Sequence, residues 1–370
     1  MATHIATRLS RYIGDDLTEN ISRGMRHWYG PPIPVLVPGG RIYAVRGGDF
    51  CGAMKGGRFS TLADYMVERT KRVTRNWVAR QRRTANMGFS SLSDLIAEAT
   101  TGGKSQILAW VKAGTAGVVG RSNSLFNVGA WPAASGVGGT TGTGRACTRT
   151  TTGAMTQVDA TGGDTLHVVT VPCYQASVAG QVLLMYDRLW DMTHTMTVDP
   201  RSCDAANPPT RYQTAALAPG NFFSGEVTTV LPAATPTITI DYIDQDGNNV
   251  TGPGLSTIAS AAAVNTIPFT LPNWFYPLNS ADQGLRSLQN SANAINLSAA
   301  MASGVVSWFI GHPLAFLPAP AANTPLIMDG INSAFNLSRI YDGACLAFLE
   351  LFKSATTATN WWGSVQLVSG

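Results

Sequence analysis

The sequence predicts a mainly β protein in which an antiparallel β-sandwich or jelly-roll body follows a basic N-terminal arm. Short apolar runs rich in Val, Leu and aromatic residues recur along the chain, and Gly, Pro, Asn and Thr separate them. Two runs, 180–190 and 344–352, read as strands buried on both faces, although their period also permits a short buried helix. Charged residues make up only 13% of the chain, which also has 38 Gly and 20 Pro. So little charge is typical of a chain that buries its surface against neighbours.

Charge divides the chain into two parts. Residues 1–85 contain 15 Lys and Arg against 6 Asp and Glu, a net charge of +9, and the remainder has a net charge of −5. We therefore expect an irregular, extended arm at residues 1–88 and a β-sandwich body at residues 89–370. The two parts are expected to face different partners.

Residues 60–83 of the arm are predicted to form a helix that Ser60 or Thr61 caps. Its narrow apolar stripe consists of Leu62, Met66, Val73 and Trp77. The remaining faces carry candidate contacts to an anionic partner, either nucleic acid or an acidic protein surface: Arg69, Lys71, Arg72, Arg75, Arg80, Arg82 and Arg83. The alternative interpretation is an ordinary solvated helix face.

The body is predicted to begin with a short helix at 91–99, capped by Ser91 or Ser93. A strand is also expected at 41–45 in the arm. The strand candidates of the body are 107–111, 117–119, 125–128, 166–174, 182–190, 226–231, 237–242, 267–271, 284–288, 295–301, 305–310, 314–317, 345–352 and 365–368. So many short strands with turn residues between them favour antiparallel sheets over βαβ units.

Asp187 and Arg188 directly follow a fully apolar run. This position predicts a strand end at which the two charges fix a corner or pair with a neighbour, and both are candidate interface residues. Large aromatic side chains dominate the energetics of many interfaces, so the candidate anchors are Trp77, Trp274, Trp361 and Trp362. Joint exposure of the last three in one groove would instead favour stacking on sugars.

No motif predicts a catalytic residue, a metal site or a cofactor. Gly103-Lys104-Ser105 imitates the end of a phosphate-binding P-loop, but Glu98 stands where that motif requires its first glycine. The five cysteines and five histidines show no metal-ligand spacing. We expect His167 and His312, which lie in strand-like runs, to be core or edge residues with satisfied hydrogen bonds.

Residues 244–249, D-Q-D-G-N-N, have the composition of a calcium loop. When Gly247 is aligned with the glycine of that loop, Tyr242 falls at the first ligand position, so the pattern fails. A turn that uses the conformational tolerance of Gly and Asn is expected instead.

Neither a signal peptide nor a membrane span is predicted. Arg8, Arg11, Asp15 and Asp16 interrupt any apolar N-terminal segment, and Gly and Pro break the uncharged stretch at 304–328 too often for a membrane helix. We expect a soluble protein that is made in the cytoplasm and has no membrane partner.

From residue 89 to residue 370 the order of short motifs resembles a family of tailed-bacteriophage virion proteins, known mostly as hypothetical or structural proteins. The motifs are S-L-S-D-L at 91–95, G-G-K-S-Q at 102–106, L-L-M-Y-D-R-L at 183–189, G-L-R-S-L-Q at 284–289, Y-D-G-A-C-L at 341–346 and Q-L-V-S-G at 366–370. The resemblance implies a capsid-associated β-sandwich protein. It brings no catalytic residues, and it does not cover the basic arm.

Together, the resemblance and the charge distribution lead us to expect a phage virion structural protein, a minor capsid or cement (decoration) protein that binds and stabilises the shell. Its expected partners are the major capsid protein and copies of itself, and the arm is expected to contact the acidic capsid lattice or packaged DNA. The expected location is the virion, after synthesis in the host cytoplasm. The alternatives are a tail or head-to-tail connector component and a receptor- or glycan-binding virion module.

Overall fold

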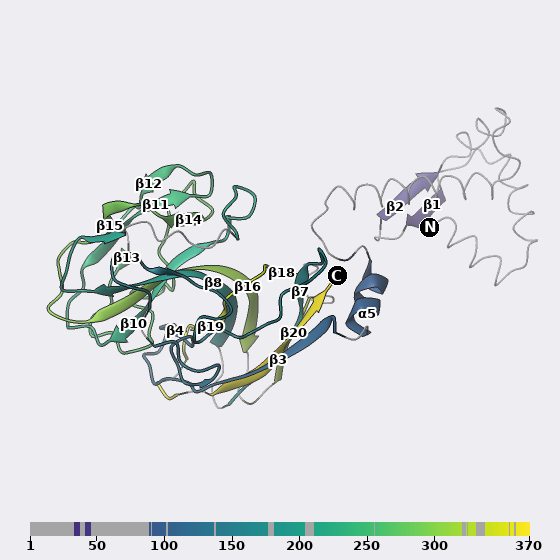
Figure 1. Ribbon diagram of the computed structural model, residues 1–370, viewed down its shortest axis with the longest axis horizontal. Coiled ribbons are helices and arrows are strands. Elements are labelled where there is room, and N and C mark those ends of the chain that lie inside the picture. Colours follow the sequence, from purple (N-terminus) through teal and green to yellow (C-terminus); the bar gives the residue numbers. More distant parts are fainter. Residues whose placement is uncertain are drawn as a thin grey trace, which may run out of the picture. The chain divides into compact units, whose positions relative to one another are not determined.

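A computed structural model gives the architecture of the body (Figure 1). The structure describes residues 33–37, 41–45, 89, 91–100, 103–136, 138–176, 181–203, 211–254, 256–319, 323, 325–330, 337–354, 356–358 and 360–370. The chain divides into two units, Met1–Asn86 and Met87–Gly370. In the first unit, strands β1 (Ile33–Val37) and β2 (Arg41–Val45) form an antiparallel pair, which confirms the predicted strand at 41–45. The predicted helix at 60–83, with its cations and Trp77, lies outside the described residues.

The second unit is mainly β, and every strand pairing described is antiparallel, as the sequence predicts. Its helix is α5 (Leu92–Thr100). Its strands are β3 (Ser105–Lys112), β4 (Asn123–Ser124), β5 (Ala130–Trp131), β6 (Arg145–Ala146), β7 (Leu166–Gln175), β8 (Gln181–Thr195), β9 (Arg201–Cys203), β10 (Phe222–Thr229), β11 (Thr237–Asp244), β12 (Asn249–Thr251), β13 (Ser256–Thr257), β14 (Leu285–Leu288), β15 (Ser291–Leu297), β16 (Val305–Ala319), β17 (Pro325–Asp329), β18 (Arg339–Ile340), β19 (Leu346–Leu351) and β20 (Trp361–Ser369).

Three sheets form the body. The central sheet has the order β10-β16-β8-β19-β4, with β6 also paired to β8. The outer sheet has the order β17-β7-β20-β3-β5, with β18 also paired to β7. The third sheet has the order β12-β11-β15-β9, with β13 and β14 also paired to β11. In Figure 1 the long strands β8 and β16 curl through the middle of the body, and the outer sheet and the third sheet lie on either side of them.

The central sheet is buried on both of its faces. Alternate residues of β8 belong to different cores: Leu184 and Tyr186 pack with the third sheet, whereas Leu183 and Met185 pack with the outer sheet. All six residues of β19 are buried in the same two-sided way. This arrangement confirms that the runs at 180–190 and 344–352 are strands with two apolar faces, and it explains why neither run alternates with polar residues.

The strands of the central and outer sheets follow one another in corresponding orders, because consecutive strands of the chain connect the two sheets. β7 leads to β8, β16 leads to β17, and β19 leads to β20, and each of these connections crosses from one sheet to the other. The order β16-β8-β19 in the central sheet therefore faces the order β17-β7-β20 in the outer sheet. Three segments of the chain, β7–β8, β16–β17 and β19–β20, each supply one strand to the central sheet and one strand to the outer sheet. The two stacked sheets form a sandwich.

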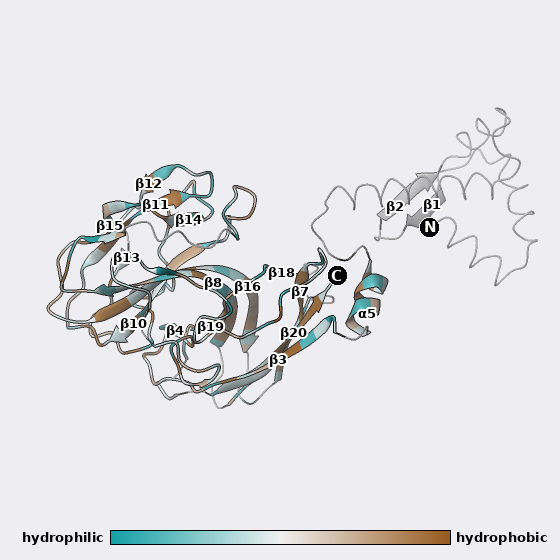
Figure 2. Cartoon of the chain, viewed as in Figure 1, coloured by the Kyte–Doolittle hydropathy of each residue, from teal (hydrophilic) through white to brown (hydrophobic). Residues whose placement is uncertain are grey.

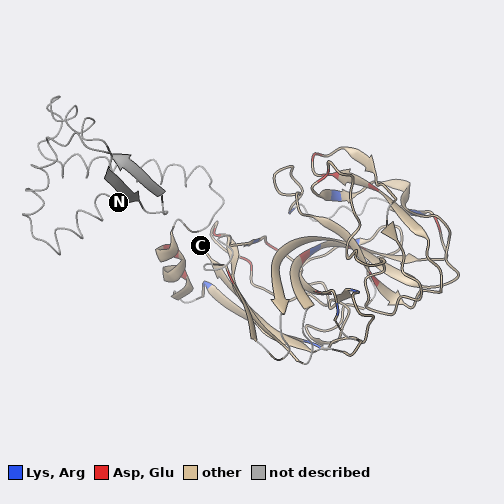
Figure 3. Ribbon diagram, turned by 180° about the vertical axis from the view of Figure 1, so that it is seen from behind, with Lys and Arg blue, Asp and Glu red and all other residues tan. Residues whose placement is uncertain are grey.

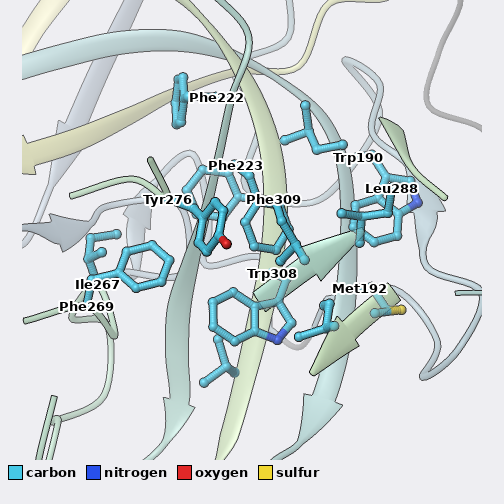
Figure 4. Close-up of a cluster of buried hydrophobic side chains, with 14 of the residues drawn as sticks. Trp190, Met192, Phe222, Phe223, Ile267, Phe269, Tyr276, Leu288, Trp308 and Phe309 are labelled. Carbon is cyan, nitrogen blue, oxygen red and sulfur yellow. The ribbon is translucent and has the colours of Figure 1, made fainter. Parts of the chain in front are cut away.

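Aromatic rings fill the core between the central and third sheets (Figure 4). The Trp308 ring of β16 stacks on Phe223 of β10, with 5.4 Å between ring centroids, and Phe269 packs at 6.0 Å from the same indole. Trp190, Phe223, Tyr276, Trp308 and Phe309 are all at most 1% exposed. Burial of such rings is the largest apolar contribution that single side chains make to a core.

α5 covers one end of the outer sheet. Its backbone is capped as predicted, because the Ser91 hydroxyl accepts the N–H of Asp94 at 3.1 Å. Figure 2 shows hydrophobic and hydrophilic stretches on this helix, and its buried residue, Leu95, packs with Phe89, Val169 and Val368. None of the helices in the described residues has the length and apolar character needed to span a membrane.

Some predicted strands are different in the structure. Residues 117–119, 125–128 and 267–271 are not strands, although Leu125, Phe126, Ile267 and Phe269 are buried. These four residues lie in loops, and their apolar side chains are buried over the cores. Phe269 forms only an isolated β-bridge, to Ile258. The segment predicted at 295–301 begins earlier, as β15.

Two predicted strands, at 305–310 and 314–317, form the single strand β16. The ladder between β16 and β8 shifts register near Gly311 and Pro313, so the strand bends there without ending. A Cβ at position 311 would lie 2.6 Å from Cδ2 of Tyr186, so glycine allows the close approach. The predicted strand at 182–190 likewise continues to Thr195, which places Asp187 and Arg188 inside β8 and not at its end.

The predicted turn at 244–249 is confirmed. Oδ1 of Asp244 accepts the backbone N–H groups of Asp246, Gly247 and Asn248 at 2.7–2.8 Å, and Gly247 has a φ of 97°. The carboxylate oxygen is thereby used to close the turn between β11 and β12.

The three described histidines have hydrogen-bond partners. His167 lies between the Thr165 hydroxyl and the Leu337 carbonyl, and His312 contacts Oδ1 of Asn221 at 2.8 Å, as predicted for these two residues. At His194, Nδ1 accepts from Nε1 of Trp308 at 3.1 Å, so Nε2 carries the proton and donates to the Val198 carbonyl at 2.7 Å. Burial lowers the pKa of His194 to about 4, so the ring is neutral at pH 7.

We predict that His194 makes the stability of the body depend on pH. Because its folded pKa lies below the unfolded value of about 6.5, its contribution is fully present above pH 6.5 and is lost as the pH falls toward 4. The loss is about 3 kcal/mol. His194→Gln should therefore show a shallower decline in the free energy of unfolding between pH 6.5 and 4 than the wild type, measured by denaturant titration. Parallel declines would contradict the assignment.

Candidate interaction surface and buried charge cluster

A cluster of ionised side chains lies inside the body around Asp187 and Arg188. Arg211 forms a bidentate ion pair with Asp187: Nε of Arg211 donates to Oδ2 of Asp187 at 2.6 Å, and Nη2 donates to Oδ1 at 2.8 Å. The same carboxylate accepts the backbone N–H of Cys345 at 2.8 Å. Arg211 also donates to the carbonyl of Cys147 at 2.8 Å. These bonds tie β8 to the start of β19 and to the loop that carries Arg211.

Arg188 is fully buried and bonds to two carboxylates. Its Nε donates to Oδ2 of Asp191 at 3.0 Å, and its Nη2 donates to Oε1 of Glu226 in β10 at 2.8 Å. The guanidinium carbon lies 4.4 Å from the ring centroid of Phe126 and 4.3 Å from that of Phe309. Its position between two aromatic faces uses the planar shape of the guanidinium group, which lysine lacks.

Asp191 completes the cluster. It accepts Nε of Arg145 in β6 and the backbone N–H of Gly139, both at 2.8 Å. Three carboxylates, Asp187, Asp191 and Glu226, thus face three guanidinium groups, those of Arg145, Arg188 and Arg211. Because formal charges balance within the cluster, the five buried groups need no external counter-ion, and the sixth, Arg145, is partly exposed.

The pKa shifts follow from burial and pairing. Burial raises the pKa of Asp187, and the bonds from Arg211 act against this rise. Burial also acts to raise the pKa of Asp191, but Arg188 and Arg145 outweigh it and hold that pKa below its ordinary value. For Arg188, burial acts to lower the pKa, whereas Glu226 and Asp191 raise it well above its ordinary value. Arg188 and Asp191 are therefore both held in their charged forms.

The structure separates the residues that the sequence groups as interface candidates. Asp187 and Arg188 are both 0% exposed and contact only this chain's own residues, so they act on the fold. Trp361 is also buried, and its Nε1 donates to Oε1 of Glu350 at 3.2 Å. Trp274 is partly buried against the core between the central and third sheets. Trp362 is 38% exposed.

Trp361 and Trp362 are adjacent in β20 and point to opposite faces of the outer sheet, since successive side chains of a strand alternate. Trp274 packs with Phe222 in a different core. The three tryptophans do not share an exposed groove, so the sugar-stacking arrangement is not formed.

Trp362 belongs to a row of side chains that crosses the outer sheet. Trp131 of β5 is paired with Val111 of β3, Val111 with Trp362, and Trp362 with Tyr174 of β7. Directly paired residues lie on the same face of a sheet, so these four side chains are neighbours there. The rings of Tyr174 and Trp362 are in contact, with 4.4 Å between centroids. Trp131 is 68% exposed and Val111 is 46% exposed.

We call the part of this face that α5 does not cover the bare face. Its residues, taken from the strand registers, are Pro325, Ile327 and Asp329 of β17, Thr170, Pro172 and Tyr174 of β7, Trp362, Ser364 and Gln366 of β20, Ile107, Ala109 and Val111 of β3, and Trp131 of β5. Asp329, at one corner, is the charged residue among them. Figure 3 shows how sparsely Lys, Arg, Asp and Glu are distributed along the ribbon of the body. The bare face is thus a nearly uncharged, partly aromatic sheet surface.

A groove adjoins the bare face beside Trp131. It has a volume of about 430 Å³ and lies between Ile107–Ala109 of β3, Trp131–Ala133 and the loop at 149–156. Its charged lining residue, Arg149, is paired with Asp159 at 2.8 Å. The groove is therefore lined mainly by apolar and hydroxyl groups. Within the described part of the chain, no group of three or more His, Cys, Asp and Glu side chains could hold a metal ion.

Sequence reasoning identified Trp362 but not its neighbours on the bare face, among them Trp131, Ile107 and Ile327. A signal was present in β3, S-Q-I-L-A-W-V-K, which is apolar at both odd and even positions. Such a run predicts burial on both faces. In the structure one face packs into the core through Trp110, and the other face exposes Ile107 (71%) and Val111.

Removal of Arg188 is predicted to destabilise the fold strongly. Arg188→Met leaves Glu226 without its cation and Asp191 with only Arg145, so the free energy of unfolding should fall by about 3–5 kcal/mol. Arg149→Gln, which breaks a partly exposed pair, should cost about 0–1 kcal/mol. Adding Glu226→Gln to Arg188→Met should recover part of the loss. Denaturant unfolding measures the free energy of unfolding of the wild type, the two single variants and the double variant. Equal losses of this free energy for Arg188→Met and Arg149→Gln would contradict a structural role for the cluster.

No protein-family profile matches this sequence, and no curated protein matches it. Among solved structures, a chain in the structure of infectious bursal disease virus, strain Gt, is similar over 72% of this chain and 80% of that chain, with 10% sequence identity and a TM-score of 0.15. The similarity to this viral structure is weak, and a TM-score this low carries no inference about what this chain does.

Proposed function

We propose that this protein is a structural subunit of a virus particle, specifically a minor capsid or cement protein that binds the shell of a tailed bacteriophage and stabilises it. The observation that supports a binding role most strongly is the bare face. Contiguous exposed apolar surface is uncommon on a soluble monomer and marks interaction sites. A sheet surface with Trp131, Val111 and Trp362 side by side has the composition of an interface centre.

The virion assignment rests on the family resemblance of residues 89–370. Three of its motifs reach framework strands: L-L-M-Y-D-R-L is part of β8, the last residue of Y-D-G-A-C-L begins β19, and Q-L-V-S ends β20, whereas S-L-S-D-L lies at the start of α5. The first of these motifs contains Asp187 and Arg188, the centre of the charge cluster. The motifs of the resemblance thus include parts of the central and outer sheets, and this supports the proposal of a common architecture for the body.

The proposed mechanism is binding without chemistry. The body supplies a rigid, three-sheet unit, and the bare face supplies contact area to neighbouring subunits, which are the major capsid protein and copies of itself. Many copies on a lattice make individually weak contacts effective, because each bound contact raises the effective concentration of the next.

The arm has a separate proposed role. Its net charge of +9 over residues 1–85 suits an anionic partner, either the acidic capsid lattice or packaged DNA. Arg69, Lys71, Arg72, Arg75, Arg80, Arg82 and Arg83 remain the predicted contacts. The division between a cationic arm and a nearly uncharged sheet surface supports two different partners for the two parts.

A tail or head-to-tail connector component is the second candidate, since a bare face suits a ring as well as a shell. A glycan-binding virion module has less support, because Trp274, Trp361 and Trp362 do not gather in a groove.

We predict that the protein is present in purified particles of the phage that encodes it, in a copy number that matches the capsomers of the shell. Quantitative mass spectrometry against isotope-labelled peptides of this chain and of the major capsid protein measures the ratio. The portal protein of the same particles calibrates the copy number of a single ring.

A ratio equal to that of the portal would replace the cement assignment with the connector assignment. Absence from purified particles would refute the virion role altogether.

A further inference from the structure

We propose that the bare face of the outer sheet binds the same face of a second copy of this chain, so that two outer sheets pack face to face about a two-fold axis. This inference rests on the proposed function, in which the bare face contacts copies of the chain, and specifies that contact. Its test uses the isolated protein, so failure of the dimer and absence from virus particles are separate outcomes.

The bare face has the exposed apolar groups that such packing needs. Ile107 is 71% exposed, Trp131 is 68% exposed, Ile327 is 66% exposed, and Val111 and Trp362 are 46% and 38% exposed. They come from four strands of one sheet and lie on one face. Within the chain, the opposite face of these strands already packs against the central sheet. A second copy would give the outer sheet the two-sided cover that the central sheet already has.

The charge pattern favours an identical partner over a charged one. In a two-fold interface each residue and its copy are brought to the same surface, so a face with many charges of one sign would repel itself. Here Asp329 is the charged residue among thirteen positions, and it lies at a corner of the face on β17. Lysine and arginine are missing from these positions, so the face offers nothing to pair with a phosphate backbone.

In this arrangement the two-fold axis lies near the centre of the face. β20 is the middle strand of the order β17-β7-β20-β3-β5, and Trp362 and Ser364 point outward from it. A two-fold axis through the middle of the face brings Ser364 of one copy near Ser364 of the other. Trp131 and the groove beside it lie at the edge, where the groove offers a recess for an apolar side chain of the second copy.

The test uses charge at position 364. We expect the full chain to have the mass of a dimer by sedimentation equilibrium, and Ser364→Lys and Ser364→Glu each to raise the dissociation constant at least tenfold, because each places like charges together at the axis. An equimolar mixture of the two variants should restore dimers, because the opposite charges then attract. Thr229→Lys and Thr229→Glu, at an exposed position of β10 in the central sheet, should leave the dimer unchanged.

Restoration by mixing shows that both variants are folded, and far-UV circular dichroism checks each one alone. A wild-type chain that is monomeric at every concentration would overturn the proposal and leave the bare face to a different protein. A dimer that is insensitive to both Ser364 variants, or is weakened equally by the Thr229 variants, would also overturn it, because association would then use another surface.

Discussion

The body depends on a central sheet that must be covered on both faces. β8 and β19 carry apolar residues at successive positions, so exposing either face would place a continuous hydrophobic surface in water. The outer and third sheets supply the two covers, and the charge cluster lies within β8 between them. Five of the six charged groups in this cluster are buried, and Arg145 is partly exposed. Burial of so many charges is tolerable when they neutralise one another. Arg188, Asp191, Glu226 and their partners neutralise one another, and they join four elements, β6, β8, β10 and the loop that carries Arg211.

The outer sheet meets the same requirement only in part. Its inner face is packed on the central sheet, and Phe89 together with Leu95 of α5 covers one end of its other face. The remainder is apolar and aromatic, carries almost no charge, and is exposed in the part of the chain that the structure describes. A surface of that kind is costly to leave in water and has little selectivity for charged ligands. These properties of the bare face suit an assembly role. The charge cluster is neutralised within the body, and the bare face can pack against another sheet.

Much of the architecture could be predicted from the sequence because β8 and β19, which are buried on both faces, contain short runs of mainly apolar residues bounded by turn residues. The runs at β8 and β19, the turn at Asp244 and the cap at Ser91 were all predicted from local residues. The length of β16 was not, since Gly311 and Pro313 normally end a strand, and only Tyr186 across the ladder explains the glycine. Asp187 and Arg188 were expected at a strand end, because a sequence cannot show that Arg211 and Glu226 return to neutralise them. The bare face depends on the registers of five strands far apart in the chain, so no local pattern could predict it.

The central claim is that the bare face is where this protein meets its partner. Hydroxyl-radical footprinting with mass spectrometry tests it directly, by comparing the oxidation rates of exposed aromatic side chains in dilute protein and in the assembled form. Trp362 and Phe275 are equally exposed, at 38%, and Phe275 lies outside the bare face, so it is a matched internal control. We predict that assembly slows the oxidation of Trp131 and Trp362 and leaves Phe275 unchanged. Unchanged rates at Trp131 and Trp362, with protection at Phe275, would contradict the claim.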